Sequence, residues 1–329
     1  MGLLVSGIIG FGTSLFFAWI VYWLDRYEKE PLLLLAGVFL WGAVIAAGSA
    51  FVVNTVMGAG ISIFTGSSSA SDLATGSLVA PLVEETLKGL AVLGVFLVFR
   101  REFDSILDGI IYAAIAALGF AATENTYYIY TYGFQQSGWA GILSISFVRV
   151  IIVGWQHPFY TAFTGIGLAV ARLNRNWGVK ILAPILGLAV AMFTHAIHNT
   201  VSTLFTGFGG FLFLTGLDWT GWFFMFIVIL WATWREQVYL KKFLASEVQA
   251  GIITQEHLRT ASSAWLQMFA RTAAIFRGKY RDTARFFQVC GEYAHKRQQY
   301  ATMGDEGGNL SVIQQLRAEM AVLAPRAQV

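Results

Sequence analysis

Seven long apolar segments limit what this chain can fold into more than any other feature. Each is long enough to cross about 30 Å of hydrocarbon, which takes roughly 20 helical residues. Because hydrocarbon offers no hydrogen-bond partners to an open backbone, segments of this kind are expected to be helical. The chain is 56% hydrophobic and only 12% charged. It is therefore predicted to be an all-α polytopic membrane protein with transmembrane helices at residues 3–24, 32–56, 73–99, 105–130, 140–171, 179–205 and 219–234.

Basic residues occupy alternate connections between these segments. The connections 57–72, 131–138 and 206–218 contain no Lys or Arg, whereas those after the first, third, fifth and seventh segments contain them: Arg26, Lys29, Arg100, Arg101, Arg172, Arg175, Lys180, Arg235, Lys241 and Lys242. Loops rich in Lys and Arg stay on the cytoplasmic side. This pattern predicts an outside N-terminus and a cytoplasmic C-terminal tail.

Two regions are expected, a transmembrane domain at 1–236 and a cytoplasmic helical tail at 237–329. The tail alternates charged and apolar residues, which predicts three or four amphipathic helices, one of them capped near Thr254. Its Cys290 is the single cysteine of the chain, so no intrachain disulfide can form. The tail shows no cluster of reactive side chains and is interpreted as a structural or docking appendage. A net charge of +3 gives no indication of nucleic-acid binding.

Three charged residues lie inside the third apolar segment. Helical spacing places Glu84 and Lys88 on one face at i and i+4, and Glu85 at i and i+3 from the same lysine, so one ammonium can serve both carboxylates. On an insertion scale each charge at the centre of a span costs roughly 2.5 to 3.5 kcal/mol. Such charges persist only with partners or a wet cavity. Pro81, one turn upstream, is expected to loosen the helix beside them.

Polar residues also interrupt the next three segments. They are Glu124 and Asn125 in the fourth, Arg149, His157 and Thr161 in the fifth, and His195, His198 and Asn199 in the sixth. The predicted topology brings these acids and imidazoles to similar depths, so we expect them to share one cavity. Arg149 is interpreted as a counter-ion or as an outer-interface residue.

Three classes of function fit this set. The first is a protease in which Glu84 or Glu85 activates water, His157 or Glu124 orients it, and His195 with Asn199 stabilises the oxyanion. The second is a metalloprotease in which His157, His195, His198 and a glutamate hold a zinc ion with an open position; no HExxH motif is present. The third is not an enzyme: intramembrane acids and imidazoles also occur in proton-coupled transporters and in scaffolds.

The ordered motifs resemble those of the PrsW family of intramembrane proteases. They are Glu84-Glu85-x-x-Lys88, Phe120-x-x-x-Glu124-Asn125, His157-x-x-x-Thr161 and His195-x-x-His198-Asn199. The family is related to the type II CAAX-prenyl endopeptidases and, more distantly, to the APH-1 subunit of gamma-secretase. The resemblance covers about residues 1–234 and implies a membrane-embedded peptidase.

The resemblance implies roles for individual positions. Glu84, Glu85, Glu124, His157, His195, His198 and Asn199 match the family's catalytic motifs, with Lys88, Asn125 and Thr161 supporting them. The related prenyl endopeptidases have a histidine where this chain has Glu124, which leaves open which side chains hold the water. The implied substrate is a membrane-anchored protein, with an anti-sigma factor as the family precedent, and the implied location is a bacterial plasma membrane. The expected partners are that substrate and the lipid bilayer, and the cofactor is either none or zinc.

Overall fold

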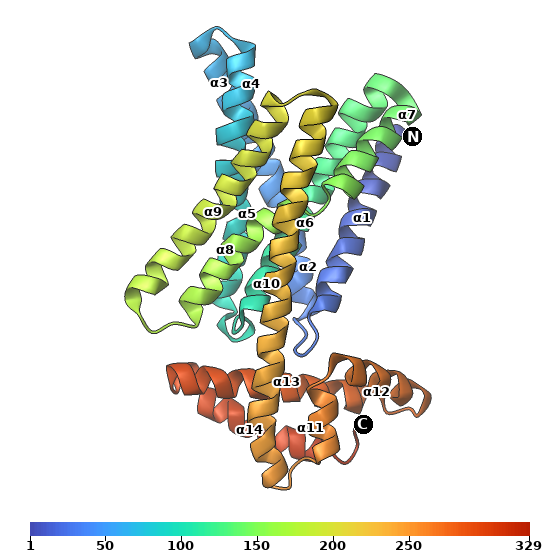
Figure 1. The fold of residues 1–329 in the computed structure, drawn as a ribbon, viewed down its shortest axis with the longest axis vertical. Coiled ribbons are helices and arrows are strands. Elements are labelled where there is room, and N and C mark those ends of the chain that lie inside the picture. The colour runs from blue at the N-terminus through green and yellow to red at the C-terminus, as the bar shows by residue number, and fades with distance from the viewer. The chain divides into compact units, whose positions relative to one another are not determined.

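The computed structural model describes the backbone of residues 1–329 and every side chain apart from that of Glu306. Helices account for all the regular structure in the described residues, which confirms an all-α fold (Figure 1). Five helical stretches are long and apolar enough, by length and composition, to cross a membrane: Gly2–Leu24, Leu32–Thr65, Ile106–Arg172, Trp177–Leu204 and Gly207–Gln249. The protein is thus a polytopic membrane protein. The count of seven spans and the outside N-terminus stay predictions.

The chain divides into two compact units. The first, called the membrane unit here, comprises residues 1–22, 31–172 and 178–227. The second, called the tail unit, comprises residues 228–329 together with two short connections, 23–30 and 173–177.

The membrane unit begins with α1 (Gly2–Leu24), which is followed by a series of helices with π-helical segments between or within them. These elements are α2 (Leu32–Leu40), η1 (Trp41–Ala46), α3 (Ala47–Thr65), α4 (Ser68–Ala74), η2 (Thr75–Val79), α5 (Ala80–Val98), η3 (Arg100–Glu102), α6 (Ile106–Tyr128), η4 (Ile129–Phe134), α7 (Gln135–Ser146), η5 (Phe147–Ile152), α8 (Gln156–Arg172), α9 (Trp177–Leu204) and α10 (Gly207–Gln249). Segments η1, η2, η4 and η5 are π-helical, and η3 is a 3₁₀ turn. Pro81 lies just after η2, as expected for a proline that removes a backbone donor.

Helix α6 lies at the centre of the membrane unit and packs against α8, α2, η1 and α5. It starts at a capping box in which the Ser105 hydroxyl accepts the Asp108 N–H and the Asp108 carboxylate accepts the Ser105 N–H. Glycine lets two backbones meet along this helix: Gly109 and Gly165 face one another across α6 and α8, and a Cβ on either would overlap the other's carbonyl. Small residues at such contacts are typical of membrane helix packing.

Helix boundaries differ from prediction in two of the uncharged connections. The predicted loop at 206–218 is wrong, because α10 begins at Gly207 and continues unbroken to Gln249 (Figure 1). The predicted loop at 57–72 is also largely helical, since α3 runs to Thr65 and α4 starts at Ser68. An absence of basic residues marks one side of a membrane and carries no information on whether the backbone there is helical.

The fifth predicted segment, 140–171, is broken in the middle. The chain reverses at Ser137 and Gly138, and it then continues through η5 to Ile152. Residues 153–155 are not helical, and α8 starts at Gln156. His157 therefore lies in the first turn of a new helix.

The tail unit contains the end of α10 and four helices, as expected, namely α11 (Gln255–Ala261), α12 (Ala264–Phe276), α13 (Tyr280–Met303) and α14 (Asn309–Leu323), with a 3₁₀ turn at Glu306–Gly308. Thr254 caps α11 as predicted, and its hydroxyl accepts the His257 N–H. The core of the unit includes Phe286, Phe287 and Cys290 of α13, together with Tyr27 from the connection 23–30.

Candidate active site

A cavity of about 670 Å³ lies inside the membrane unit. Its lining comes from α3, η2, α5, α6, η5, α8 and α9, and from residues 153–155. Six predicted site residues line it: Glu84, Glu124, His157, His195, His198 and Asn199. The expectation that polar residues of four segments share one cavity is confirmed.

Glu85 is fully buried, and both of its carboxylate oxygens are occupied. The ammonium of Lys88 and Nδ1 of His195 lie 2.5 and 2.9 Å from Oε1, and the Thr161 hydroxyl donates to Oε2 at 2.8 Å. Lys88 and Thr161 are also completely buried. Glu85 therefore joins α5 to α8 and α9, and it has no free oxygen for a reacting molecule.

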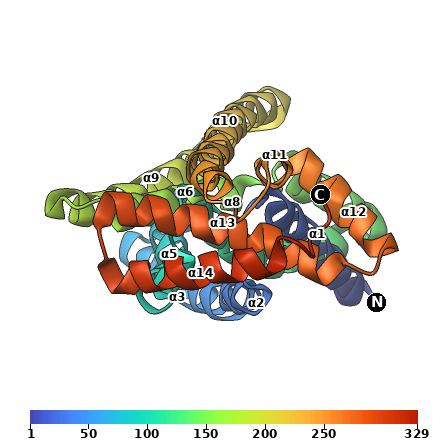
Figure 2. The same cartoon turned by 90° about the horizontal axis from the view of Figure 1, so that it is seen from below.

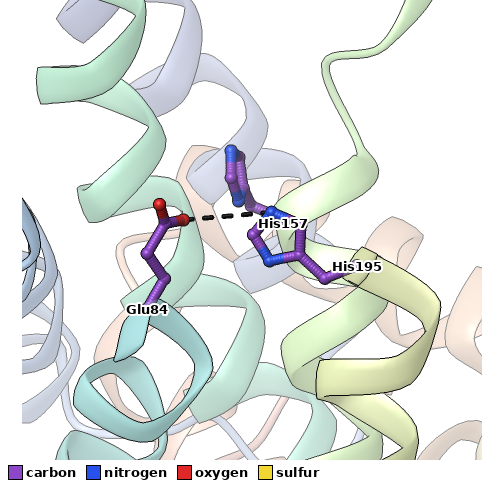
Figure 3. Close-up of side chains that lie close together, drawn as sticks. All are labelled: Glu84, His157 and His195. Carbon is purple, nitrogen blue, oxygen red and sulfur yellow. Dashed lines mark ion pairs between the residues drawn. The ribbon is translucent and has the colours of Figure 1, made fainter. Parts of the chain in front are cut away.

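Glu84 differs from its neighbour in having one uncommitted oxygen. Its Oε1 accepts from Asn54 at 3.3 Å, whereas its buried Oε2 has no hydrogen-bond partner among the described residues. Lys88 Nζ and His195 Nε2 both lie 3.9 Å from Oε2. Figure 3 shows Glu84 pointing toward the imidazoles of His157 and His195. A buried acceptor without a partner is costly, so this oxygen is available to a ligand.

His157 is held between a cation and an anion. Its Nδ1 lies 3.2 Å from Lys88 Nζ, and its Nε2 lies 2.8 Å from Glu124 Oε2. Because an ammonium only donates, Nδ1 is the acceptor, and the ring proton on Nε2 faces the carboxylate. These two contacts fix both the tautomer and the orientation of the ring.

Arg149 anchors this side of the site. It forms an ion pair with Glu124, donates from Nε to Asn125 Oδ1 at 2.7 Å, and stacks over Tyr128 at 4.1 Å from the ring centre. The interpretation of Arg149 as a counter-ion is confirmed. Asn125 is buried and acts on the arginine without lining the cavity.

His198 belongs to a second polar group, one that was not predicted. Its Nδ1 lies 3.1 Å from Asp218 Oδ2 and 2.7 Å from the Gln156 amide nitrogen, and that amide also donates to Asp218. Asp218 was missed because it falls in the supposed loop at 206–218. Gln156 was missed because a neutral amide in a span is a weak signal; its position directly before His157 is the one feature that could have drawn attention to it.

Two further side chains of the lining bear on the chemistry. Asn199 donates one amide proton to the Gly76 carbonyl in η2 at 2.9 Å and keeps its other amide proton. Tyr160 stacks on His195 with ring centres 4.8 Å apart. The Tyr160 hydroxyl is buried and has no hydrogen-bond partner in the described part of the chain. Tyr160 was not among the predicted site residues, because a tyrosine in a span is usually a packing or interface residue.

One set of side chains fits a divalent metal. Ligand atoms of Glu84, His157 and His195 lie within 4.8 Å of one another. Two imidazoles and one carboxylate match the donors of catalytic zinc sites, and a histidine that gives its other N–H to a carboxylate is the usual supporting arrangement, here His195 with Glu85. The free Oε2 of Glu84 strengthens the fit. The predicted ligands were His157, His195, His198 and a glutamate, and the structure places His198 beside Asp218 instead.

Fold and site together define a polytopic α-helical membrane protein with a buried glutamate and histidine centre. Residues 30–233 match the family model described as PrsW family intramembrane metalloprotease. This match covers more than half of the chain, and the chain belongs to the PrsW family, as its motifs predicted.

Individual relatives agree with this assignment. The chain is 37% identical over 114 residues to Protease PrsW of Clostridioides difficile, a match covering 34% of this chain and 46% of that protein. It is 34% identical over 125 residues to Protease PrsW of Geobacillus kaustophilus, covering 38% and 52%, and 26% identical over 211 residues to that of Bacillus subtilis, covering 64% and 83%. The chain thus spans about half the length of the first two relatives. No solved structure matches.

Proposed function

We propose that this protein is an intramembrane endopeptidase that hydrolyses a peptide bond in a membrane-anchored protein. The observation that carries the proposal is the free Oε2 of Glu84, which is buried at the cavity wall and lies 3.9 Å from Nε2 of His195. Its neighbour Glu85 is fully engaged, so the two glutamates of the motif have different roles. Family membership supports the same activity.

Glu84 is the general base in this proposal. Its free oxygen takes a proton from a water molecule in the cavity, and the resulting hydroxide attacks the carbonyl carbon of the substrate. Glu124 orients this water from the facing wall of the cavity, because Arg149 and Nε2 of His157 hold its carboxylate in place through Oε2.

The oxyanion that forms needs proton donors. Asn199 retains one amide N–H and is the predicted donor that is ready to act. His195 presents Nε2 as an acceptor while its Nδ1 proton faces Glu85, so it stabilises the oxyanion only after Nε2 has gained a proton. The proton that Glu84 takes from water passes to Nε2 of His195, 3.9 Å away, and from there to the leaving amine when the peptide bond breaks.

A zinc-dependent form of this peptidase is the second candidate, favoured by the convergence of three ligand atoms within 4.8 Å. Glu84, His157 and His195 would hold the ion, and His157 would give up one of its two present contacts. A bound zinc ion lowers the pKa of its water to about 7 and polarises a carbonyl. Glu85 and Glu124 then act through the histidines that they contact.

Substrate and location are proposed on family precedent. A single-span, membrane-anchored protein such as an anti-sigma factor is the proposed substrate, in a bacterial plasma membrane with the tail in the cytoplasm. The site residues all belong to the membrane unit. The scissile bond is therefore expected within or beside the bilayer.

The test is cleavage of a panel of single-span, anti-sigma-like membrane proteins co-expressed with the wild type or with Glu84→Gln. Asp72→Asn, at an exposed acid of α4, is the matched control for loss of one charge. A new fragment that requires Glu84 and survives Asp72→Asn supports a peptidase. A fragment that persists with Glu84→Gln at matched expression overturns the assignment of the base.

Metal analysis separates the two forms. Stoichiometric zinc in the purified wild type, lost in both Glu84→Gln and His195→Ala, supports the zinc-dependent form. Cleavage by protein from which the metal has been stripped excludes that form. Proton-coupled flux in liposomes, with no fragment from any substrate, would favour a transporter or a scaffold instead.

A further inference from the structure

Helix α12 of the tail unit carries its large apolar side chains on its exposed face. Phe276, Trp265 and Phe269 have 86%, 67% and 62% of their surfaces exposed, and Ile275 and Met268 are exposed beside them. The buried face of the same helix consists of Ala270, Ala274 and Gln267. This arrangement is the reverse of a helix folded against a soluble core.

The five apolar residues form one continuous surface. Trp265, Met268, Phe269 and Phe276 follow the i, i+3, i+4 and i+11 spacing of a single helical face, and Thr272 at i+7 is its one polar member. Ile275 lies on the same side, seven residues after Met268. Figure 2 shows α12 at one edge of the tail unit, at the opposite end of α13 from the connection to α14. The α12 face, defined by Trp265, Met268, Phe269, Ile275 and Phe276, has no partner in the described residues of that unit.

The sequence around this face is basic. Between His257 and Arg281 the sequence contains no Asp or Glu, and it contains five cations: Arg259, Arg271, Arg277, Lys279 and Arg281. Arg277, Lys279 and Arg281 are exposed directly after the last apolar residue. An apolar face with a basic border is the composition of helices that lie in the interface of an anionic membrane.

Contacts inside the tail unit tie the start of α12 to residues next to the membrane spans. Tyr27, which follows the first span, interacts with the backbone of Ala264 and with the side chain of Gln237. The amide of Gln237 also donates to the Ser262 carbonyl at 2.8 Å. Gln237 is two residues beyond Arg235, the first charge after the last apolar segment.

Aromatic residues of the same unit mark the level of the interface. Trp23, Trp231 and Trp234 are exposed, and Arg26 and Arg235 stack over Trp23 and Trp231. Tryptophans with adjacent arginines are typical of the membrane–water boundary. The contacts of Tyr27 and Gln237 therefore hold α12 within a short distance of that boundary.

We propose that α12 is an interfacial membrane helix: its face of Trp265, Met268, Phe269, Ile275 and Phe276 inserts into the leaflet on the tail side, and its basic border contacts anionic lipid headgroups. The occupant of the face is the lipid of the protein's own bilayer. The proposal does not depend on the peptidase activity. In this proposal the tail unit lies on the membrane surface and is not freely solvated.

The test uses the full chain in nanodiscs that hold one molecule each, made from equal parts of phosphatidylcholine and phosphatidylglycerol. A nitroxide is attached to Phe269→Cys or Phe276→Cys, with Ser311→Cys, an exposed position on α14, as the control. Burial raises the pKa of the Cys290 thiol, so the native cysteine stays unlabelled, and the wild type measures the background. Accessibility is measured to oxygen, which concentrates in lipid, and to a nickel chelate, which stays in water.

For each label the ratio of its accessibility to oxygen to its accessibility to nickel is compared. We expect this ratio to be several-fold higher for the labels at 269 and 276 than for the label at 311. Replacing Arg277, Lys279 and Arg281 together by glutamine should reduce this difference, as should pure phosphatidylcholine. Labels at 269 and 276 that are as accessible to nickel as the control overturn the proposal. Shielding that arises only when two chains share a nanodisc also overturns it, in favour of a second copy as the occupant.

Discussion

Glu85 of α5 and His195 of α9 form a buried contact, with Oε1 of the carboxylate 2.9 Å from Nδ1 of the ring. The same ring directs its other nitrogen toward Glu84, at 3.9 Å. Two consecutive glutamates of α5 therefore contact opposite nitrogens of one histidine of α9. One of them holds the ring, and the other shares the cavity with it.

This division predicts different behaviour for the two glutamine variants. Glu84→Gln should abolish cleavage while changing the free energy of unfolding little, because the lost oxygen has no hydrogen-bond partner and lies 3.9 Å from the ammonium of Lys88, which keeps Glu85. Glu85→Gln should abolish cleavage and also destabilise the protein by about 3 to 5 kcal/mol, because it removes the close partner of a buried ammonium. Thermal unfolding in detergent, measured beside the cleavage assay, distinguishes the two. Equal melting temperatures for both variants would contradict the assigned roles.

Tyr160→Phe tests whether the unpartnered hydroxyl serves the reaction. Removing a buried hydroxyl that has no partner should not destabilise the fold. If the hydroxyl donates to the oxyanion, turnover should fall by roughly 100-fold, with little change in substrate affinity. Steady-state kinetics on a detergent-solubilised substrate measures this. Unchanged kcat would show that the tyrosine only packs against His195.

Asp218→Asn tests the second polar group. The carboxylate lies 3.1 Å from Nδ1 of His198, so its loss should leave that ring less well oriented and lower the rate of cleavage. If Asp218 acts through His198, the double variant Asp218→Asn/His198→Ala should be no slower than His198→Ala alone. If the fold-reduction of the double variant equals the product of the two single-variant reductions, Asp218 and His198 act independently.

Gly165→Ala should destabilise the membrane unit. Its added methyl would overlap the Gly109 carbonyl where α6 and α8 meet, and overpacking of this kind costs about 1 to 3 kcal/mol. Gly94→Ala on α5 is the matched control, because a Cβ there meets no atom within 4 Å. The difference in melting temperature between the two alanine variants is the measurement. Equal melting temperatures would mean that the two helices can separate without cost.

The tail unit should lose stability in mild acid through His257. Burial lowers the pKa of this imidazole below its usual 6.5, and its Nδ1 accepts the Thr254 N–H at 3.1 Å. The unfolded chain binds the proton more readily than the folded one, so the stabilisation is complete above pH 6.5 and decreases as the pH falls below it. The melting temperatures of wild type and His257→Gln should be measured across this pH range. We expect the difference between them to decrease as the pH falls. A difference in melting temperature that does not change with pH would show that protonation of His257 is not coupled to folding of the tail unit.

The sequence predicted those parts of the site that depend on local helical geometry. Lys88 contacts both Glu84 and Glu85, as their spacing requires, and Thr254 caps α11. The helical repeat and the type of each side chain determine which residues contact one another within one helix. The class of the fold followed in the same way from the length of the apolar segments.

Contacts between helices could not be predicted in the same way. The pairing of Arg149 with Glu124, and of His198 with Asp218, depends on how each helix is rotated and shifted against the next. A single sequence does not set those two quantities. The break at residues 153–155 was hidden because its residues are as apolar as their neighbours, so the segment appeared to be one continuous span.

The buried cluster has a consequence for electroneutrality. Glu84, Glu85 and Glu124 can carry three negative charges, whereas Lys88 and Arg149 can carry two positive ones. A medium of low dielectric constant tolerates an unbalanced charge poorly, so one more positive charge is required. Either a proton on a carboxyl or an imidazole, or a bound cation, can provide it. One proton balances the cluster, whereas a zinc ion brings two positive charges. A zinc ion that enters the site must therefore displace this proton, and it leaves one positive charge in excess, which favours an anion beside it.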